Sequence, residues 1–219
     1  MNSFNGEDSQ KNPSIKISVV MSTHSINLDW LKLSIESILK QSFREFEFVI
    51  VIDSPSDLNL KNFLSEYKRQ DERIKLILNQ KTYGFPKSIN KAIQKSKGTY
   101  IARMDSDDIS EVDRLFLQYE FMEKNKTISI CGTNARIINS EGNIVGNFIR
   151  PTNQAAIEQY IYHQNPLIHP TYLVRTEVYR KLNYYKDITP GQDYEFLARA
   201  FLANYKIANL NFFGLKYRT

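Results

Sequence analysis

The first half of the chain alternates four times between strand-like apolar runs and segments with helical periodicity, and this alternation restricts the fold more than any other feature. Residues 46–53, FEFVIVID, are almost continuously apolar and β-branched, as expected of a strand covered on both faces. The pattern predicts an α/β fold, with an open, mostly parallel sheet, right-handed crossovers and helices on both faces. Pro86 is expected to begin the third helix and Gly98 to end it. The other strands are expected at residues 15–21, 74–78 and 99–104, and the helices around 28–39, 60–67 and 86–93.

Residues 109–219 are less regular. Ser110 and Asp113 are spaced to cap a helix over residues 112–122. No repeat and no low-complexity linker separates the halves, residues 15–108 and 109–219, so we expect one domain with a shared core. Strand-like segments are expected at 128–132, 135–139, 143–146, 169–174 and 208–218, and helices around 157–161 and 194–201.

Charge and composition exclude several functional classes. Twenty-nine Lys and Arg against 24 Asp and Glu leave a net charge of +5, and the basic residues are scattered rather than clustered. This excludes a nucleic-acid-binding arm, so no nucleic-acid partner is expected, but it allows a mildly basic face against an anionic ligand or a membrane. Cys131 is the only cysteine and the three histidines are widely separated, so a reducing compartment fits and a zinc site does not.

The start of the chain and its hydropathy point to the cytosol. Residues 1–14 are polar, without the apolar core of a signal peptide, and we expect them to form a flexible tail. No apolar stretch approaches the roughly 20 residues of a membrane-spanning helix. We therefore expect a cytoplasmic protein, with at most peripheral contact to the inner face of a membrane.

The sequence lacks the common fingerprints for nucleotide and calcium loops. None of the eight glycines forms G-x-G-x-x-G, and there is no G-K-[ST]. An EF-hand beginning at Asp105 would need glycine at Ser110 and glutamate at Phe116, and neither is present. A nucleotide would have to be held by other means.

The acidic segment Asp105-Ser106-Asp107-Asp108 directly follows the fourth expected strand. In an extended chain, Asp105 and Asp107 project the same way, roughly 7 Å apart, and would repel each other unless a cation joined them. Mg²⁺ or Mn²⁺, held by one or two carboxylates and completed by phosphate oxygens, would suit such a pair. The alternative is that these acids only cap the following helix, which Asp108 or Ser110 could do.

Several segments, taken in order, resemble one enzyme family. Residues 18–25, SVVMSTHS, and 34–57, SIESILKQSFREFEFVIVIDSPSD, resemble the opening strand, first helix and second strand of the family 2 glycosyltransferases, which are inverting enzymes of the GT-A fold. Residues 79–110, NQKTYGFPKSINKAIQKSKGTYIARMDSDDIS, are similar to that family's third helix and acid-rich segment. HPTYLVR at 169–175 and GQDYEFLAR at 191–199 resemble its acceptor-side segments, so the resemblance covers nearly the whole chain.

The resemblance implies a nucleotide-sugar donor, usually a UDP-sugar, whose diphosphate binds Mn²⁺ or Mg²⁺ at the acidic segment. Asp107 would be the direct metal ligand, and Asp105 would contact the metal or the donor ribose. Ser106 and Lys87 would also contact the donor, with Lys87 near the diphosphate. Lys87 also belongs to a stripe of lysines at i, i+4 spacing that is typical of a solvated helix face. Residues 15–108 would form the nucleotide-sugar-binding half.

The nucleobase would bind near the first two strands. The resemblance implies that Asp53 hydrogen-bonds the base and that Thr23 and His24 line its site, where the His24 ring could stack on it. The alternative for Asp53 is a turn-forming role beside Ser54 and Pro55. His24-Ser25 stands where the family usually has Tyr-Asn, and residues 52–55 replace Asp-Asp-Gly-Ser, so both departures fall in the expected base pocket rather than at the expected metal site.

The acceptor-side half, residues 109–219, would supply the general base. Asp193 matches the second acid of the family's E-D pair, while Gln192 replaces the first. Asp193 would take the proton from an acceptor hydroxyl as that oxygen attacks the anomeric carbon. The alternatives are an ordinary helix N-cap at Asp193, or a base supplied by Asp187 or Glu195.

Three functional classes remain open from the sequence. The favoured one is a metal-dependent hexosyltransferase acting on a saccharide or lipid-linked acceptor, as in the synthesis of bacterial surface polysaccharide. The second is a catalytically inactive partner subunit that binds nucleotide-sugar; Gln192 favours it and the retained acids oppose it. The third is a phosphatase of the haloacid dehalogenase type, which also places D-x-D after a strand but needs further acids that are missing or misplaced here.

Overall fold

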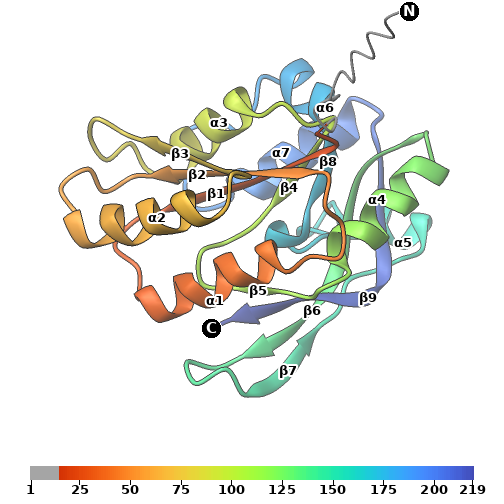
Figure 1. Ribbon diagram of the computed structural model, residues 1–219. Helices are drawn as coiled ribbons and strands as arrows, with labels where there is room; N and C mark the ends of the chain where they lie inside the picture. Colours follow the sequence, from red (N-terminus) through yellow and green to blue (C-terminus); the bar gives the residue numbers. More distant parts are fainter. Residues whose placement is uncertain (1–14) are drawn as a thin grey trace, which may run out of the picture.

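A computed structural model describes residues 15–219, which form a twisted nine-stranded sheet with helices on both faces (Figure 1). The flexible tail expected at residues 1–14 lies outside the described residues. None of the helices in the described part of the chain is long and apolar enough to cross a membrane.

The first half of the sheet is parallel and agrees with the sequence prediction. The strands lie in the order β3-β2-β1-β4, and each pairs in parallel with its neighbour. Side chains alternate between the faces of β1: Val19 and Met21 pack with α1 and α2, whereas Val20 packs with α3. The elements are β1 (Ile17–Thr23), α1 (Leu28–Leu39), β2 (Phe46–Ile52), α2 (Leu58–Gln70), β3 (Ile74–Leu78), α3 (Phe85–Lys95) and β4 (Tyr100–Arg103).

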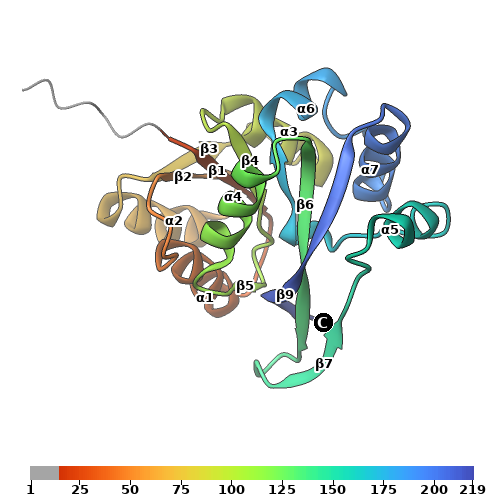
Figure 2. The ribbon, with the colours of Figure 1, turned by 90° about the vertical axis from the view of Figure 1, so that its right-hand side faces the viewer.

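The second half extends the same sheet with mixed strand directions. β8 lies antiparallel between β4 and β6, and the long strands β6 and β9 run parallel, side by side (Figure 2). β5 pairs with β9, and β7 pairs with β6. The elements are β5 (Ile109–Ser110), α4 (Arg114–Lys124), β6 (Ile128–Ile138), β7 (Ile144–Phe148), α5 (Gln154–Tyr160), a 3₁₀ turn (His169–Thr171), β8 (Leu173–Arg175), α6 (Thr176–Lys181), α7 (Gln192–Leu202) and β9 (Lys206–Arg218).

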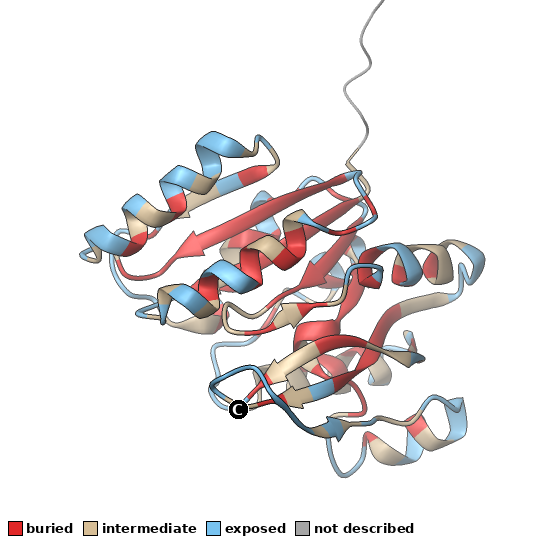
Figure 3. Cartoon of the chain, turned by 60° about the horizontal axis from the view of Figure 1, so that its bottom comes forward, coloured by how far each residue is buried: buried red, intermediate tan, exposed pale blue. Residues whose placement is uncertain are grey.

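Two apolar clusters hold the layers together, and both contain residues from each half of the chain. On one face of the sheet, α1, α2 and α4 cover the strands, with Leu31, Leu64 and Leu115 fully buried. On the other face, α3 and α7 contribute Ile89 and Phe196 to the second cluster. The central strands are buried while the outer faces of the helices stay exposed (Figure 3). The same packed core therefore positions residues from both halves.

The predicted cap of the fourth helix is wrong. Ser110 lies in β5, where its amide donates to Ser37 Oγ at 2.9 Å, and Asp113 makes no side-chain cap bond. The Gln41 side chain at the end of α1 takes this role, because its Oε1 accepts the Leu115 amide at 3.0 Å. The alternative that the acids of 105–108 cap this helix is wrong for the same reason.

Four other elements differ from the sequence prediction. Gly98 does not end α3, which stops at Lys95; instead a Cβ at Gly98 would lie 2.5 Å from the Ser18 backbone nitrogen, so this turn requires glycine to approach β1. The segments 128–132 and 135–139 form one strand, β6, because β9 pairs along its length. Helix α6 was not predicted, and the first three residues of 169–174 form a 3₁₀ turn rather than a strand.

Candidate active site

The carboxyl ends of β2, β1 and β4 lie next to one another and bring several of the predicted residues to one edge of the sheet. Thr23 and Asp53 end neighbouring strands, and the Asp53 amide donates to the Thr23 carbonyl at 2.9 Å. The exposed His24 ring lies beside them, its Nδ1 being 3.1 Å from the Asp53 carbonyl and 2.7 Å from Ser54 Oγ. Thr23 Oγ1 is buried and has no hydrogen-bond partner among the described residues.

The Asp53 carboxylate is enclosed by the loop that leads to α3. Its Oδ1 accepts from Asn79 Nδ2 at 2.6 Å and from the Tyr83 amide at 2.9 Å, and its Oδ2 accepts from the Gly84 amide at 2.9 Å. The residue is only 2% exposed. Asp53 therefore holds residues 79–84 against the end of β2, and its role in binding a nucleobase stays a prediction.

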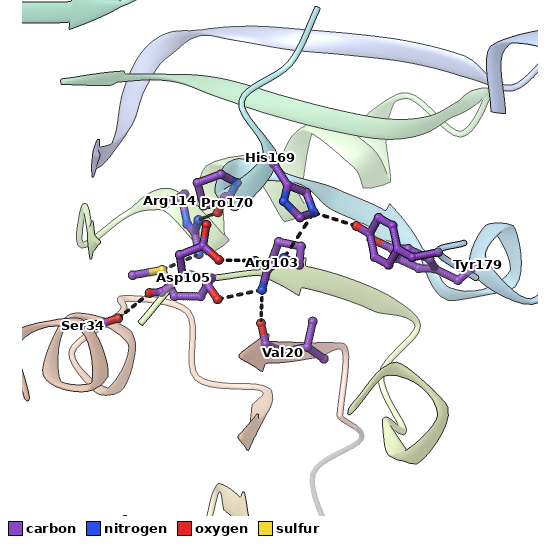
Figure 4. Close-up of polar contacts among 10 residues, drawn as sticks. Val20, Ser34, Arg103, Asp105, Arg114, His169, Pro170 and Tyr179 are labelled. Carbon is purple, nitrogen blue, oxygen red and sulfur yellow. Dashed lines mark hydrogen bonds and ion pairs between the residues drawn. The ribbon is translucent and has the colours of Figure 1, made fainter. Parts of the chain in front are cut away.

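The acidic segment that follows β4 is held from two sides (Figure 4). Asp105 forms an ion pair with the fully buried Arg103, and Ser34 of α1 donates to the Asp105 carbonyl at 2.8 Å. The Arg103 guanidinium also donates to the carbonyls of Val20 and Met104 at 3.2 and 2.8 Å. Asp105 thus has a fixed partner inside the protein.

Asp107 is half-buried, and its neighbour Asp108 is buried. Burial raises the pKa of Asp107, and the charge of Asp105 raises it further. Burial also raises the pKa of Asp108, whose Oδ1 accepts the Arg218 amide at 2.8 Å while its buried Oδ2 has no partner among residues 15–219. The Arg218 side chain donates to the Asp107 carbonyl at 2.9 Å and lies over the Trp30 ring, which fixes the segment.

This donor set fits a hard divalent ion. No other described residue donates a hydrogen bond to the Asp107 carboxylate, and the repulsion that raises its pKa is what a bound cation would relieve. Residues 15–219 contain no group of three or more His, Cys, Asp or Glu side chains placed to hold a metal. The chain would therefore supply one or two carboxylates, from Asp107 and Asp105, and a ligand's phosphate oxygens would complete the shell.

The proposed base lies at the start of α7, which the second half of the chain supplies. Gly191, with φ +105°, is the N-cap residue, so Asp193 lies in the first turn and the N-cap alternative is wrong. The positive end of the helix favours a carboxylate there. Asp193 Oδ2 accepts from Asn165 Nδ2 at 2.7 Å. The alternative bases are in ion pairs: Asp187 with Lys87 at 2.5 Å and Glu195 with Arg199 at 2.5 Å.

Tyr217, near the end of β9, is affected by the charge of acids from both halves of the chain. Burial raises the pKa of its phenol, and the negative charges of Asp108, Asp105, Asp107 and Asp193 raise it further. The phenol therefore lies within electrostatic reach of both sets of acids, and its ring packs edge-on against Phe148. Sequence reasoning missed Tyr217, because only the pairing of β9 with β6 brings the end of the chain to this edge.

A buried cluster joins the acidic segment to the HPTYLV segment. His169 Nε2 lies 3.4 Å from Arg103 Nε and 3.0 Å from the Tyr185 hydroxyl (Figure 4). Burial, and then the charge of Arg103, lower the pKa of His169 well below its usual value, so the ring is neutral and its Nε2 accepts both bonds. The sequence singled out neither Arg103, which is fully buried and pairs with Asp105, nor His169, which in turn contacts Arg103.

Lys87 stands in the first turn of α3, and its ammonium group pairs with the exposed Asp187 of the loop before α7. Its neighbour Lys91 donates to Asn79 Oδ1 at 2.8 Å, so the stripe of lysines is not simply a solvated face. Ser106 is partly buried between the two acids. The ion pair thus places Lys87 beside the loop that leads to α7. Its contact with a diphosphate stays a prediction.

Comparison with known proteins finds one family and several relatives. The model of glycosyl transferase family 2 matches residues 18–182. An uncharacterized glycosyltransferase of Methanocaldococcus jannaschii is 35% identical over 204 residues, which are 92% of this chain and 70% of that protein. The O-antigen biosynthesis glycosyltransferase WbnJ of Escherichia coli is 31% identical over 207 residues, which are 92% of this chain and 79% of WbnJ.

A solved structure shows the same fold. S. aureus TarS 1–349 in complex with UDP-GlcNAc matches with a TM-score of 0.75 at 22% identity, over 93% of this chain and 58% of the TarS chain. The chain therefore spans somewhat more than half the length of that TarS chain. This likeness confirms the predicted fold class.

Proposed function

The chain belongs to glycosyl transferase family 2, and we propose that it transfers a sugar from a nucleotide-sugar, most simply a UDP-sugar, to a hydroxyl group of a saccharide or lipid-linked acceptor. Its enzyme class is that of a glycosyltransferase, so the phosphatase alternative is wrong. The O-antigen role of WbnJ supports a saccharide acceptor in polysaccharide synthesis.

One observation carries the proposal. Acids from both halves of the chain, Asp105 and Asp107 after β4 and Asp193 at the start of α7, all raise the pKa of one phenol, that of Tyr217. A transferase needs this combination, because the leaving diphosphate and the attacking hydroxyl must be handled on opposite sides of one sugar carbon. The complex of TarS with UDP-GlcNAc supports a UDP-sugar as the donor.

A divalent ion, Mn²⁺ or Mg²⁺, would be held by Asp107 with Asp105 beside it. When bound, it would neutralise the negative charge that develops on the departing diphosphate. Lys87 would add a cation near the diphosphate, having left its exposed pairing with Asp187. The pairing of Asp105 with buried Arg103 favours Asp107 as the direct ligand, because Asp105 already has a cationic partner.

Asp193 would act as the general base of a single, inverting displacement. Its carboxylate has a neutral hydrogen-bond partner, so it is free to accept the proton of the acceptor hydroxyl. Asp187 and Glu195 are less suited, since each is already paired with a cationic side chain, Lys87 and Arg199 respectively.

The test is release of nucleoside diphosphate from UDP-glucose, UDP-GlcNAc and GDP-mannose, with Mn²⁺ and a short-chain prenyl-diphosphate-GlcNAc acceptor. We expect one UDP-sugar to be turned over and the acceptor to accelerate the release. Asp193→Asn should lower transfer by about 10²- to 10⁴-fold, the usual contribution of a positioned base, and leave donor binding intact. Asp187→Asn is the matched control and should stay within a few-fold of wild type.

Two results would count against the proposal. Donor binding without turnover, whatever acceptor is offered, would support the inactive partner subunit. Transfer by Asp193→Asn within a few-fold of wild type would remove Asp193 from the mechanism.

A further inference from the structure

Asn165 makes three hydrogen bonds that fix the direction of its amide. It lies between α5 and the 3₁₀ turn and is partly buried. Its Oδ1 accepts from the Leu167 amide at 3.0 Å and from the Tyr172 hydroxyl at 2.9 Å. Its Nδ2 donates to Asp193 Oδ2 at 2.7 Å. One short side chain thus joins a core tyrosine to the carboxylate at the start of α7.

The reverse orientation of this amide is excluded by its partners. Turning it over would place the NH₂ group against the Leu167 amide, which can only donate, and would place the carbonyl oxygen against the Asp193 carboxylate, which can only accept. Tyr172 is fully buried, and burial raises the pKa of its phenol well above the usual value, so the hydroxyl keeps its proton and remains a donor. The orientation of the Asn165 amide is therefore fixed by its partners.

These bonds determine how the Asp193 carboxylate is held. Asn165 holds Oδ2, whereas no described residue donates to Oδ1, and the side chain is only partly buried. A neutral amide orients the Asp193 carboxylate without an ion pair, whereas Asp187 faces a lysine and Glu195 faces an arginine. Of these three acids, Asp193 alone is held by a neutral partner.

We propose that Asn165 is a positioning residue for the transfer reaction: it turns Asp193 so that Oδ1 faces the acceptor hydroxyl. This inference rests on the proposed function, because it assumes that Asp193 takes the proton. The proton passes from the acceptor hydroxyl to Asp193 as the new oxygen–carbon bond forms and the bond to the diphosphate breaks. Asn165 itself gains and loses nothing.

The variant Asn165→Asp separates this role from a purely structural one. The new carboxylate can still accept from the Leu167 amide and the Tyr172 hydroxyl, so the local turn keeps both bonds. It cannot donate to Asp193, however, and it faces a second carboxylate. The double variant N165D/D193N exchanges the two side chains and restores a hydrogen bond with donor and acceptor reversed. Asn147→Asp is the matched control, because Asn147 is exposed on β7 and its side chain makes no hydrogen bond among the described residues.

Two readouts are measured for these variants. At pH 7.5, N165D should lower Tm by about 2–4 °C, a shift typical of one lost interaction in a chain of this size, and N165D/D193N should recover it. With UDP-glucose or UDP-GlcNAc, whichever the wild type turns over, N165D should lower kcat by about 10- to 100-fold with the donor KM unchanged. The double variant should be no slower than D193N, because without a base nothing remains to be positioned.

The outcomes that overturn the inference differ from those that overturn the function. N165D at the wild-type Tm and kcat would show that the pair does not form or does not matter. If N165D lowers kcat by the same factor in the D193N background as in wild type, the role of Asn165 is only structural. A wild-type protein that turns over none of the nucleotide-sugars would overturn the proposed function, while recovery of Tm in the double variant would still report the pairing.

Discussion

Replacing Asp53 tests whether its carboxylate serves the fold or only a ligand. In Asp53→Ala, the three groups that donate to it, Asn79 Nδ2 and the amides of Tyr83 and Gly84, would all lose their acceptor. Hydrogen bonds to a charged group contribute about 1.5–3 kcal/mol each. Because water can enter and satisfy part of this need, we expect a loss of about 4–6 kcal/mol in the free energy of unfolding, or about 10–20 °C in Tm.

Urea denaturation of Asp53→Ala measures this loss, and Asp57→Ala serves as the control. Asp57 caps α2 by accepting the Leu60 amide at 2.9 Å, so its removal should cost only about 1 kcal/mol. UDP and GDP binding are measured on the same samples at a temperature where the variant is folded. If Asp53→Ala weakens the binding of UDP and of GDP equally, the result fits a carboxylate whose role is to hold the 79–84 loop in place.

The reasoning is refuted if Asp53→Ala unfolds within about 1 kcal/mol of wild type yet loses its preference for UDP over other nucleotides. That result would show that the three hydrogen bonds are dispensable and that Asp53 reads the base, as the family resemblance implies.

Three further predictions concern other parts of the edge and its support. The pKa of His169 is lowered in the folded protein, so below about pH 6.5 the unfolded chain binds a proton that the folded chain does not. The free energy of unfolding should therefore fall by up to about 2 kcal/mol from pH 7 to 5. His169→Gln should flatten this part of a Tm–pH profile. An unchanged slope would show that the ring ionises freely. Gly98→Ala should cost about 2–3 kcal/mol in urea denaturation, because its Cβ meets the Ser18 backbone; wild-type stability would show that the turn can move. Lys87→Ala should leave Tm almost unchanged but weaken UDP binding most at low salt, whereas Asp187→Ala should not weaken it; equal effects would place Lys87 away from the diphosphate.

The elements of the first half follow from sequence because their periodicity is strong. β2 is buried along its whole length, as its continuous apolar run predicts, and α1 spans the predicted residues 28–39. In the second half the signals are local and weak. Helix α6 has six residues, too few to show a period, and the start of α4 is set by Gln41, which is far away in the sequence. Tertiary contacts decide such boundaries.

The residues of the candidate site also fall into a group that the sequence predicts and a group that it does not. The acids Asp105, Asp107 and Asp193 could be chosen from sequence because they stand in segments with a recognisable order. Their partners could not be chosen from sequence, since Arg103 is indistinguishable there from other strand residues and Asn165 from other loop residues. The bond between Asn165 and Asp193 joins residues 28 positions apart, and only the packing of α7 brings them together.

The central claim is that Asp107, at the carboxyl edge of β4, binds a nucleoside diphosphate through a divalent ion. Calorimetric titration of UDP into wild type and Asp107→Asn, each with Mn²⁺ and with EDTA, tests it most directly. Wild type should bind UDP at least about tenfold more tightly with Mn²⁺, a difference of about 1.4 kcal/mol. Asp107→Asn should lose that difference and keep its Tm, because burial already disfavours the charge at this position. UDP binding that ignores Mn²⁺ in wild type, or an Mn²⁺ effect that survives in Asp107→Asn, would contradict the claim.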